Sequence, residues 1–149
     1  MNTLNIFISG LISGIIIYQS FVVASTVFKS LELKHSSVFL RLIFPKFFML
    51  ISILGLISLI LNFIYSASFY QYIVSGLTLV LAIICYVIIP ATNKATDDNN
   101  KNKFRILHTV SVVLTLIMLI LNITIIGVKL NDVIEIFFKV LIYNINVNE

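Results

Sequence analysis

Long apolar runs separated by short polar segments dominate the chain, and their lengths predict its architecture. No charged side chain precedes Lys29, and a second uncharged run extends over residues 47–93. As a single helix the second run would be about 70 Å long, more than twice the thickness of a bilayer core, so it must fold back on itself. The predicted membrane spans cover residues 4–28, 47–65, 71–90 and 104–128.

Two segments outside the predicted spans have patterns of their own. The stretch YSASFYQY, residues 65–72, combines small polar residues with aromatic rings, which suits a turn at a membrane interface. In the tail, Asp132, Glu135 and Lys139 recur at helical spacing on one face, opposite an apolar face. This pattern predicts a short amphipathic helix over residues 131–144 that lies along the interface, with a partner-docking helix as the alternative.

Composition indicates the same class of protein. Hydrophobic residues make up 60% of the 149 residues and charged residues only 11%, against roughly a quarter in soluble domains. A chain this short and apolar cannot hide its apolar surface in one water-soluble core, so lipid is its expected solvent. We therefore predict an all-α transmembrane four-helix bundle that forms a single integral membrane domain over residues 1–149. Membrane lipids are its expected partners, and the net charge of +4 requires no nucleic-acid partner.

Basic residues predict the orientation of the chain in the membrane. Eight of the ten Lys and Arg residues lie between spans one and two or between spans three and four: Lys29, Lys34, Arg41, Lys46, Lys94, Lys101, Lys103 and Arg105. The positive-inside rule places segments 29–46 and 91–105 in the cytoplasm, and hence both termini outside an inner (plasma) membrane. A secretory signal peptide would need a Lys or Arg ahead of the first apolar run, so this run is expected to remain as a span.

Each predicted span carries its small and polar residues on one side. In span four such residues fall within an arc of about 80°. They are His108, Ser111, Thr115, Met118 and Asn122, and Arg105 extends the line. In span one Gly10 and Gly14 form a GxxxG motif, and the repeated letters LILN place Asn62 and Asn122 alike in spans two and four. These stripes predict helix packing through close backbone approach and interhelical hydrogen bonds, with a path for protons or a polar solute along span four as the alternative.

Candidate cofactor chemistry rests on two histidines and the single cysteine. His108 and Cys85 are each expected about one turn inside the cytoplasmic ends of their spans, with His35 on a neighbouring connection. A His/Cys/His set can hold a metal or haem iron, but the spacing of these residues is not diagnostic of such a site. Paired catalytic carboxylates, a phosphate-binding glycine loop and an HExxH motif are all absent from the sequence.

These observations favour a non-enzymatic accessory or assembly protein with no catalytic residues and no bound cofactor. Its partners beyond lipid would be other membrane proteins or a second copy of the chain, because stripes of small residues let helices dock closely. A haem- or metal-binding redox protein that uses His108 is one alternative. A small solute or proton carrier that uses the span-four stripe is the other.

Three short motifs carry a resemblance to a known family. They are IFPKFF at residues 43–48, IIPATN at residues 88–93 and FRILHTVS at residues 104–111. In order and spacing they resemble the transmembrane-protein-205-like family, also catalogued as domain of unknown function 4149, whose members are small four-span membrane proteins. The resemblance covers nearly the whole chain and assigns motif positions to Phe44, Pro45, Phe48, Pro90, Leu107, His108 and Ser111.

The resemblance implies an architecture but no settled activity. Phe47 stands where the family is expected to have tyrosine, and Thr115 where many members have asparagine, so roles that need those polar groups are not carried over. We expect Pro45 near the start of the span-two helix, where its missing N–H needs no partner, and Pro90 at the end of span three. The three motifs are then predicted to meet at the cytoplasmic face, with His108 pinning the end of span four.

Overall fold

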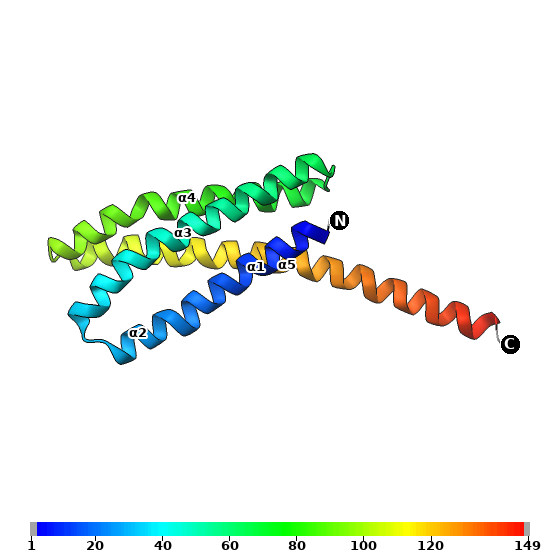
Figure 1. The fold of residues 1–149 in the computed structure, drawn as a ribbon, viewed down its shortest axis with the longest axis horizontal. Helices are drawn as coiled ribbons and strands as arrows, with labels where there is room; N and C mark the ends of the chain where they lie inside the picture. Colours follow the sequence, from blue (N-terminus) through cyan, green and yellow to red (C-terminus); the bar gives the residue numbers. More distant parts are fainter. Residues whose placement is uncertain (1–2, 148–149) are drawn as a thin grey trace.

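Helices form almost all of the described chain, as the sequence predicts. The computed structural model describes the backbone of residues 3–147, and the side chains of this range except at 33–34, 132 and 140–147. The elements are α1 (Thr3–Ile17), the π-helix η1 (Tyr18–Val23), α2 (Ala24–Ser30), α3 (Leu33–Ile64), α4 (Phe69–Asp97) and α5 (Lys101–Val147) (Figure 1). Within the described residues four helical stretches are long and apolar enough to cross a membrane, as expected of a multi-pass membrane protein.

The first span is one continuous helical stretch, Thr3–Ser30, because η1 joins α1 to α2 without a break. A π-helix is a rare form that places an extra residue in a helical turn, and it often occurs at functional sites. Its polar residue Gln19 is turned inward and is buried. The chain then passes through Leu31 and Glu32 into α3.

α3 is longer than predicted and begins well ahead of Pro45. The expectations of a basic loop over residues 29–46 and of Pro45 near a helix start are therefore wrong, since most of that segment is helical. A proline inside a helix leaves the carbonyl four residues earlier, here that of Arg41, without its usual N–H donor. Membrane helices tolerate such prolines because neighbouring groups can satisfy the freed carbonyl. Basic side chains by themselves do not end a helix whose apolar pattern continues.

The predicted turn between spans two and three is confirmed. α3 ends at Ile64 and α4 begins at Phe69, so the turn between them lies within the predicted segment 65–72. Ser68 and Gln71 form a capping box at the start of α4, in which the Ser68 N–H donates to Gln71 Oε1 at 3.3 Å. Such reciprocal bonds satisfy backbone donors that a helix start leaves without intrahelical partners.

The far end of α4 corrects the predicted connection between spans three and four, residues 91–105. Pro90 lies inside α4 and does not end it, and the helix continues to Asp97, so the polar linker shrinks to residues 98–100. The hydroxyl of Thr92 donates to a carbonyl one turn earlier, at 3.1 Å, and Ala95 is buried. Polar composition predicted a loop here, whereas hydrogen bonding within the helix and packing of its small residue keep it helical.

α5 continues well beyond the other helices. Its 47 residues form one helix, which at 1.5 Å per residue is about 70 Å long. The tail is helical as predicted, but it is the extension of α5 and not a separate element, and it projects from the bundle (Figure 1). No proline follows Pro90 and no glycine follows Gly127, so the sequence has no strong helix breaker at the predicted boundary near residue 130.

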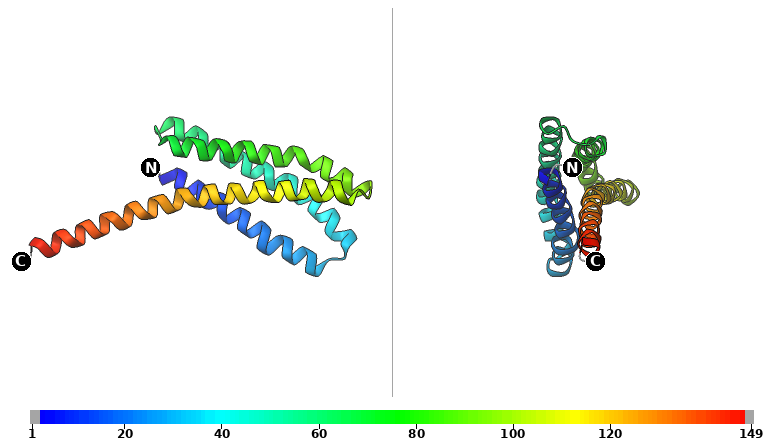
Figure 2. Two further views of the ribbon diagram at one scale, coloured as in Figure 1. Left: turned by 180° about the vertical axis from the view of Figure 1, so that it is seen from behind. Right: turned by 90° about the vertical axis from the view of Figure 1, so that its right-hand side faces the viewer.

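The four spans pack as a bundle that is open at one end. α3 and α4 form an antiparallel hairpin, α5 packs along α4, and α1 contacts both α3 and α5. Toward the α4–α5 loop, α2 diverges from the start of α5, as both side views show (Figures 1 and 2). The buried apolar cluster comprises Ile8, Ile12, Ile16, Phe47, Phe48, Ile51, Ala82, Cys85 and Met118.

Candidate functional site

The most distinctive feature of the bundle interior is a set of buried polar side chains, which we call the polar core. Each of the four spans contributes one carboxamide to it, and none of these four residues is more than 2% exposed. Hydroxyl groups of α3 and α4 complete the set, so that interhelical hydrogen bonds hold the helices together in a lipid environment. The polar core consists of Asn5, Ser58, Asn62, Gln71, Ser75, Thr78 and Asn122.

Asn62 is the centre of the polar core. Its Nδ2 donates to Ser75 Oγ at 2.8 Å and to the Gln71 carbonyl at 3.0 Å, and its Oδ1 accepts a hydrogen bond from Asn5 Nδ2. Ser58 Oγ donates to Asn5 Oδ1 at 3.1 Å. One fully buried side chain on α3 thus connects α1 to α4.

Asn122 repeats this arrangement on the other side of α4. Its Nδ2 donates to Thr78 Oγ1 at 2.9 Å and to the carbonyl of Met118, one turn earlier in α5, at 2.8 Å. Ser75 and Thr78 lie about one turn apart on α4, so this helix offers one hydroxyl to the asparagine of each flanking helix. The LILN repeat in spans two and four therefore has a structural counterpart.

Two residues of this interior were not singled out from the sequence. Asn5 is a lone polar residue near the start of the first apolar run, and only its contact with Asn62 shows its role. Gln19 stands in the π-helical segment, and its Nε2 is buried without a hydrogen-bond partner among the described residues. The same holds for Gln71 Nε2 in the polar core. A buried donor in this state carries a desolvation cost that a bound water or ligand acceptor would remove.

The first of the three sequence motifs packs into the core. Phe47 and Phe48 belong to the buried cluster, and Phe44 stacks on Phe48 with ring centroids 6.3 Å apart. Cys85 is buried in the same cluster, with its Sγ 3.9 Å from the carbonyl of Ser111. Ile89 of the second motif also packs against this cluster, as does Leu114, which lies about one turn past the third motif.

His108 does not join the other motifs. It is exposed, and its ring stacks on that of Phe104 in the same helix, with centroids 5.6 Å apart. Burial along the span-four stripe increases from exposed His108, through half-buried Ser111, to buried Asn122. The expected pinning of α5 by His108 is therefore not what the structure shows, because α2 diverges from this part of α5 and leaves the histidine uncovered (Figure 2). Arg105, one turn earlier, is exposed as well.

The candidate metal or haem residues are likewise not brought together. Cys85 is buried, whereas His35 is exposed and lies 3.9 Å from Glu32 of its own connection. Among the described residues, no three His, Cys, Asp or Glu side chains are grouped closely enough to hold a metal ion. The similar depth inferred from the sequence does not produce a shared site, because Cys85 is buried whereas both histidines are exposed.

The GxxxG motif is not the closest helix contact within this chain. A Cβ added at Gly10 would lie 3.9 Å from Ile126 Cδ1, and one at Gly14 would meet no heavy atom within 4 Å. At Gly55, by contrast, it would lie 3.1 Å from the backbone nitrogen of Leu79. Among the glycines, the tightest approach is therefore between α3 and α4, at Gly55.

Comparison with known families adds an independent result. The model of the family described as domain of unknown function (DUF4149) matches residues 7–101. This chain belongs to the DUF4149 family. The matched region contains the first two sequence motifs and ends just before the third. Comparisons with curated proteins and with solved structures find no match.

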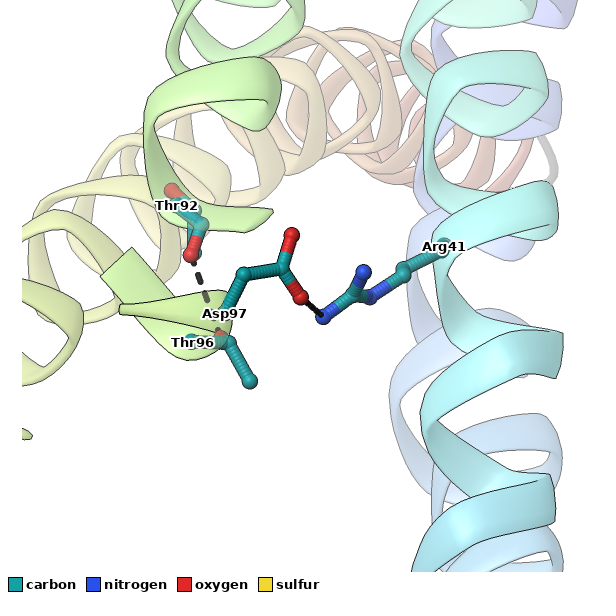
Figure 3. A network of polar contacts seen from close by, with 4 residues as sticks. All are labelled: Arg41, Thr92, Thr96 and Asp97. Carbon is teal, nitrogen blue, oxygen red and sulfur yellow. Dashed lines mark hydrogen bonds and ion pairs between the residues drawn. The ribbon is translucent and has the colours of Figure 1, made fainter. Parts of the chain in front are cut away.

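An ion pair connects two helices of the DUF4149 region. Arg41 of α3 extends to Asp97 near the end of α4, and its Nη2 lies 2.6 Å from Asp97 Oδ1 (Figure 3). In the same view Thr96 donates to the carbonyl of Thr92 at 3.2 Å, which holds the last turn of α4 in shape (Figure 3). The sequence did not predict this pair, because both partners were assigned to loops.

Neutralising this ion pair is expected to have a small effect. The two side chains are 33% and 59% exposed, and exposed pairs typically contribute about 0.2–1 kcal/mol. Asp97→Asn should therefore lower the free energy of unfolding by less than about 1 kcal/mol, and the loss should shrink in high salt. Equilibrium unfolding at low and high salt measures this change in the free energy of unfolding. Asp98→Asn is the control at the next position. Equal effects of the two substitutions would show that the pair contributes nothing specific.

Proposed function

We propose that this protein is a non-enzymatic accessory or assembly protein of the inner membrane, which docks other membrane helices through α1. The observation that carries the proposal is the outward position of Gly14: it is exposed and has open space around its missing Cβ. The opposite face of α1 is used inside the bundle, where Ile12 and Ile16 are each 1% exposed. Glycines spaced by four residues in a membrane helix allow a second helix to approach closely.

The polar core supports the same conclusion. Its carboxamides bond mainly to one another, to hydroxyls and to backbone carbonyls of neighbouring helices, so their evident use is to hold the bundle together. A scaffold held in this way can present a stable outer surface to a partner. We also propose that the chain belongs to the transmembrane-protein-205-like branch of the family. This assignment rests on the three motifs.

The proposed orientation has both termini outside the cell and the α2–α3 and α4–α5 connections in the cytoplasm. It rests on the basic residues near those connections and on the positive-inside rule. Reporters fused at the α4–α5 connection, next to Lys101, and at the α3–α4 turn test it. Cytoplasmic signal from the first and external signal from the second are expected, and the reverse pattern would contradict the orientation.

The docking function predicts that Gly14→Val disrupts a complex without unfolding the protein. A valine there should block close approach of a partner helix, while the bundle, which has no atom near that position, keeps its stability. Purification from native membranes in mild detergent, followed by native mass spectrometry, measures the loss. Gly76→Val is the control, because a Cβ at Gly76 also meets nothing within 4 Å. A wild-type protein that purifies only as a lone monomer would count against the proposal.

The alternative functions predict different results in the same preparations. A haem or metal protein would show a Soret band or bound metal that His108→Ala removes. Because His108 is exposed, its substitution is not expected to disturb the packing of the bundle. A carrier would move a solute into liposomes and lose that activity in Ser111→Ala. We expect a colourless, metal-free protein in which His108→Ala leaves stability and complex formation unchanged.

A further inference from the structure

The end of the bundle can be located on α5 from two interhelical contacts. The hydroxyls of Tyr70 and Thr124 share a hydrogen bond, and deeper in the bundle Asn122 donates to Thr78 at 2.9 Å. Tyr70 stands in the first turn of α4, next to the α3–α4 turn, so Thr124 is level with this end of the bundle. The part of α5 that follows residue 129 therefore extends past the other helices (Figures 1 and 2).

This projecting segment has a surface that does not suit water. All of its large apolar residues with described side chains are 44% exposed or more. Isolated exposed apolar residues are ordinary, but a contiguous group of this size marks an interaction surface. The group consists of Leu130, Val133, Ile134, Ile136, Phe137 and Phe138.

The polar residues of the same segment occupy one narrow side of the helix. By helical spacing Asn131, Asp132, Glu135 and Lys139 fall within an arc of about 100°. Lys139 Nζ lies 2.7 Å from Glu135 Oε1, so these two charges compensate each other. The apolar residues cover an arc of about 200°, with Phe137 near its centre.

We propose that residues 130–139 of α5 bind the surface of the lipid bilayer at the end of the bundle that holds the α3–α4 turn. The breadth of the apolar arc favours lipid over a single partner helix, because a helix–helix seam covers a narrower stripe whereas an interfacial helix inserts a broad one. The segment also continues directly from a membrane span, so the bilayer surface is the nearest apolar phase.

This placement requires α5 to bend where it leaves the bundle. Gly127 comes just before the segment, and a Cβ there would meet nothing within 4 Å. Glycine has a low helix propensity, which lowers the resistance of the helix to bending at this position. The inference rests on the membrane-spanning bundle and is independent of the proposed docking function of α1.

Tryptophan fluorescence can test the proposal directly, because the chain contains no tryptophan. Phe137→Trp and Val133→Trp place the only indole on the apolar side, and Lys139→Trp places it on the polar side. Each variant is reconstituted into vesicles of phosphatidylcholine and phosphatidylglycerol that contain lipids brominated near the top of their acyl chains. We expect the two apolar-side variants to emit at shorter wavelength and to be quenched by bromine several-fold more than Lys139→Trp.

Two results would overturn the proposal. Equal, weak lipid quenching of all three variants, together with strong quenching by aqueous acrylamide, would place the segment in water. Blue-shifted emission without lipid quenching would instead place it against a protein, either a second copy or another partner. Two independent apolar positions keep the result interpretable should one variant fail to insert, and neither outcome depends on whether Gly14→Val loses a partner.

Discussion

Asn62→Leu is expected to destabilise the bundle by about 3 kcal/mol, the largest effect that we predict for a single side chain. Interhelical hydrogen bonds in membranes contribute about 0.6 kcal/mol on average and up to about 1.7. Leucine would remove the three side-chain bonds of Asn62 to Asn5, Ser75 and the Gln71 carbonyl. It would also leave the buried amide of Asn5 without its acceptor, which costs about 1–3 kcal/mol.

Unfolding in mixed micelles by increasing fractions of dodecyl sulfate measures this loss. Asn122→Leu is the matched control, since it removes one interhelical side-chain bond, to Thr78, and should cost about 0.6–1.7 kcal/mol. Equal stabilities of Asn62→Leu and the wild-type protein would show that the polar core does not hold the helices together. An equal loss in the two leucine variants would show that Asn62 is not its centre.

Gly55→Val is expected to lower the stability by about 1–3 kcal/mol, the usual range for overpacking a tightly packed interior. Even a Cβ at this position would lie 3.1 Å from the backbone nitrogen of Leu79 and 3.2 Å from its Cα. Backbone atoms cannot rotate away as the end of a flexible side chain can, so α3 and α4 must move apart. The same unfolding experiment measures the change.

Gly14→Val provides the control for this prediction. It makes the same chemical change in a membrane helix but in open space, so its stability should stay within about 0.5 kcal/mol of the wild-type value. A loss of similar size at both positions would attribute the effect of Gly55→Val to helix propensity and not to the contact with Leu79. The Gly14 variant thus serves twice, as a neutral control for stability and as the test of partner docking.

The polar core shows how far the candidate site could be predicted. The stripe pattern correctly singled out Asn62 and Asn122 as inward-facing, because polar side chains in lipid must find partners within the protein. Their actual partners could not be predicted, since the pairing of Asn62 with Asn5 joins residues far apart in the sequence. Which helix lies beside which decides these bonds, and a stripe on one helix carries no information about its neighbour.

His108 shows the opposite case: the stripe pattern was correct, but the expected contact of His108 with neighbouring helices was not. The histidine does lie on the stripe of span four, but the stripe is buried only where α1 and α4 cover it. Near the α4–α5 loop, α2 diverges and His108 stays exposed. The GxxxG motif is a second correct pattern whose position in the fold differs from the expectation. Gly14 faces away from the bundle, while Gly55 makes the close contact.

The sequence by itself determined the membrane class, the four spans, the turn before α4 and the helical character of the tail. These follow from the number and periodicity of apolar residues, which act locally and need no knowledge of neighbouring helices. Only the tertiary structure decided that α3 and α4 continue through Pro45 and Pro90, that Gly55 makes the closest contact among the glycines, and that one asparagine joins three helices. Each of these depends on contacts between distant segments, because in lipid the packing of helices against one another, and not their hydrophobicity, selects the arrangement.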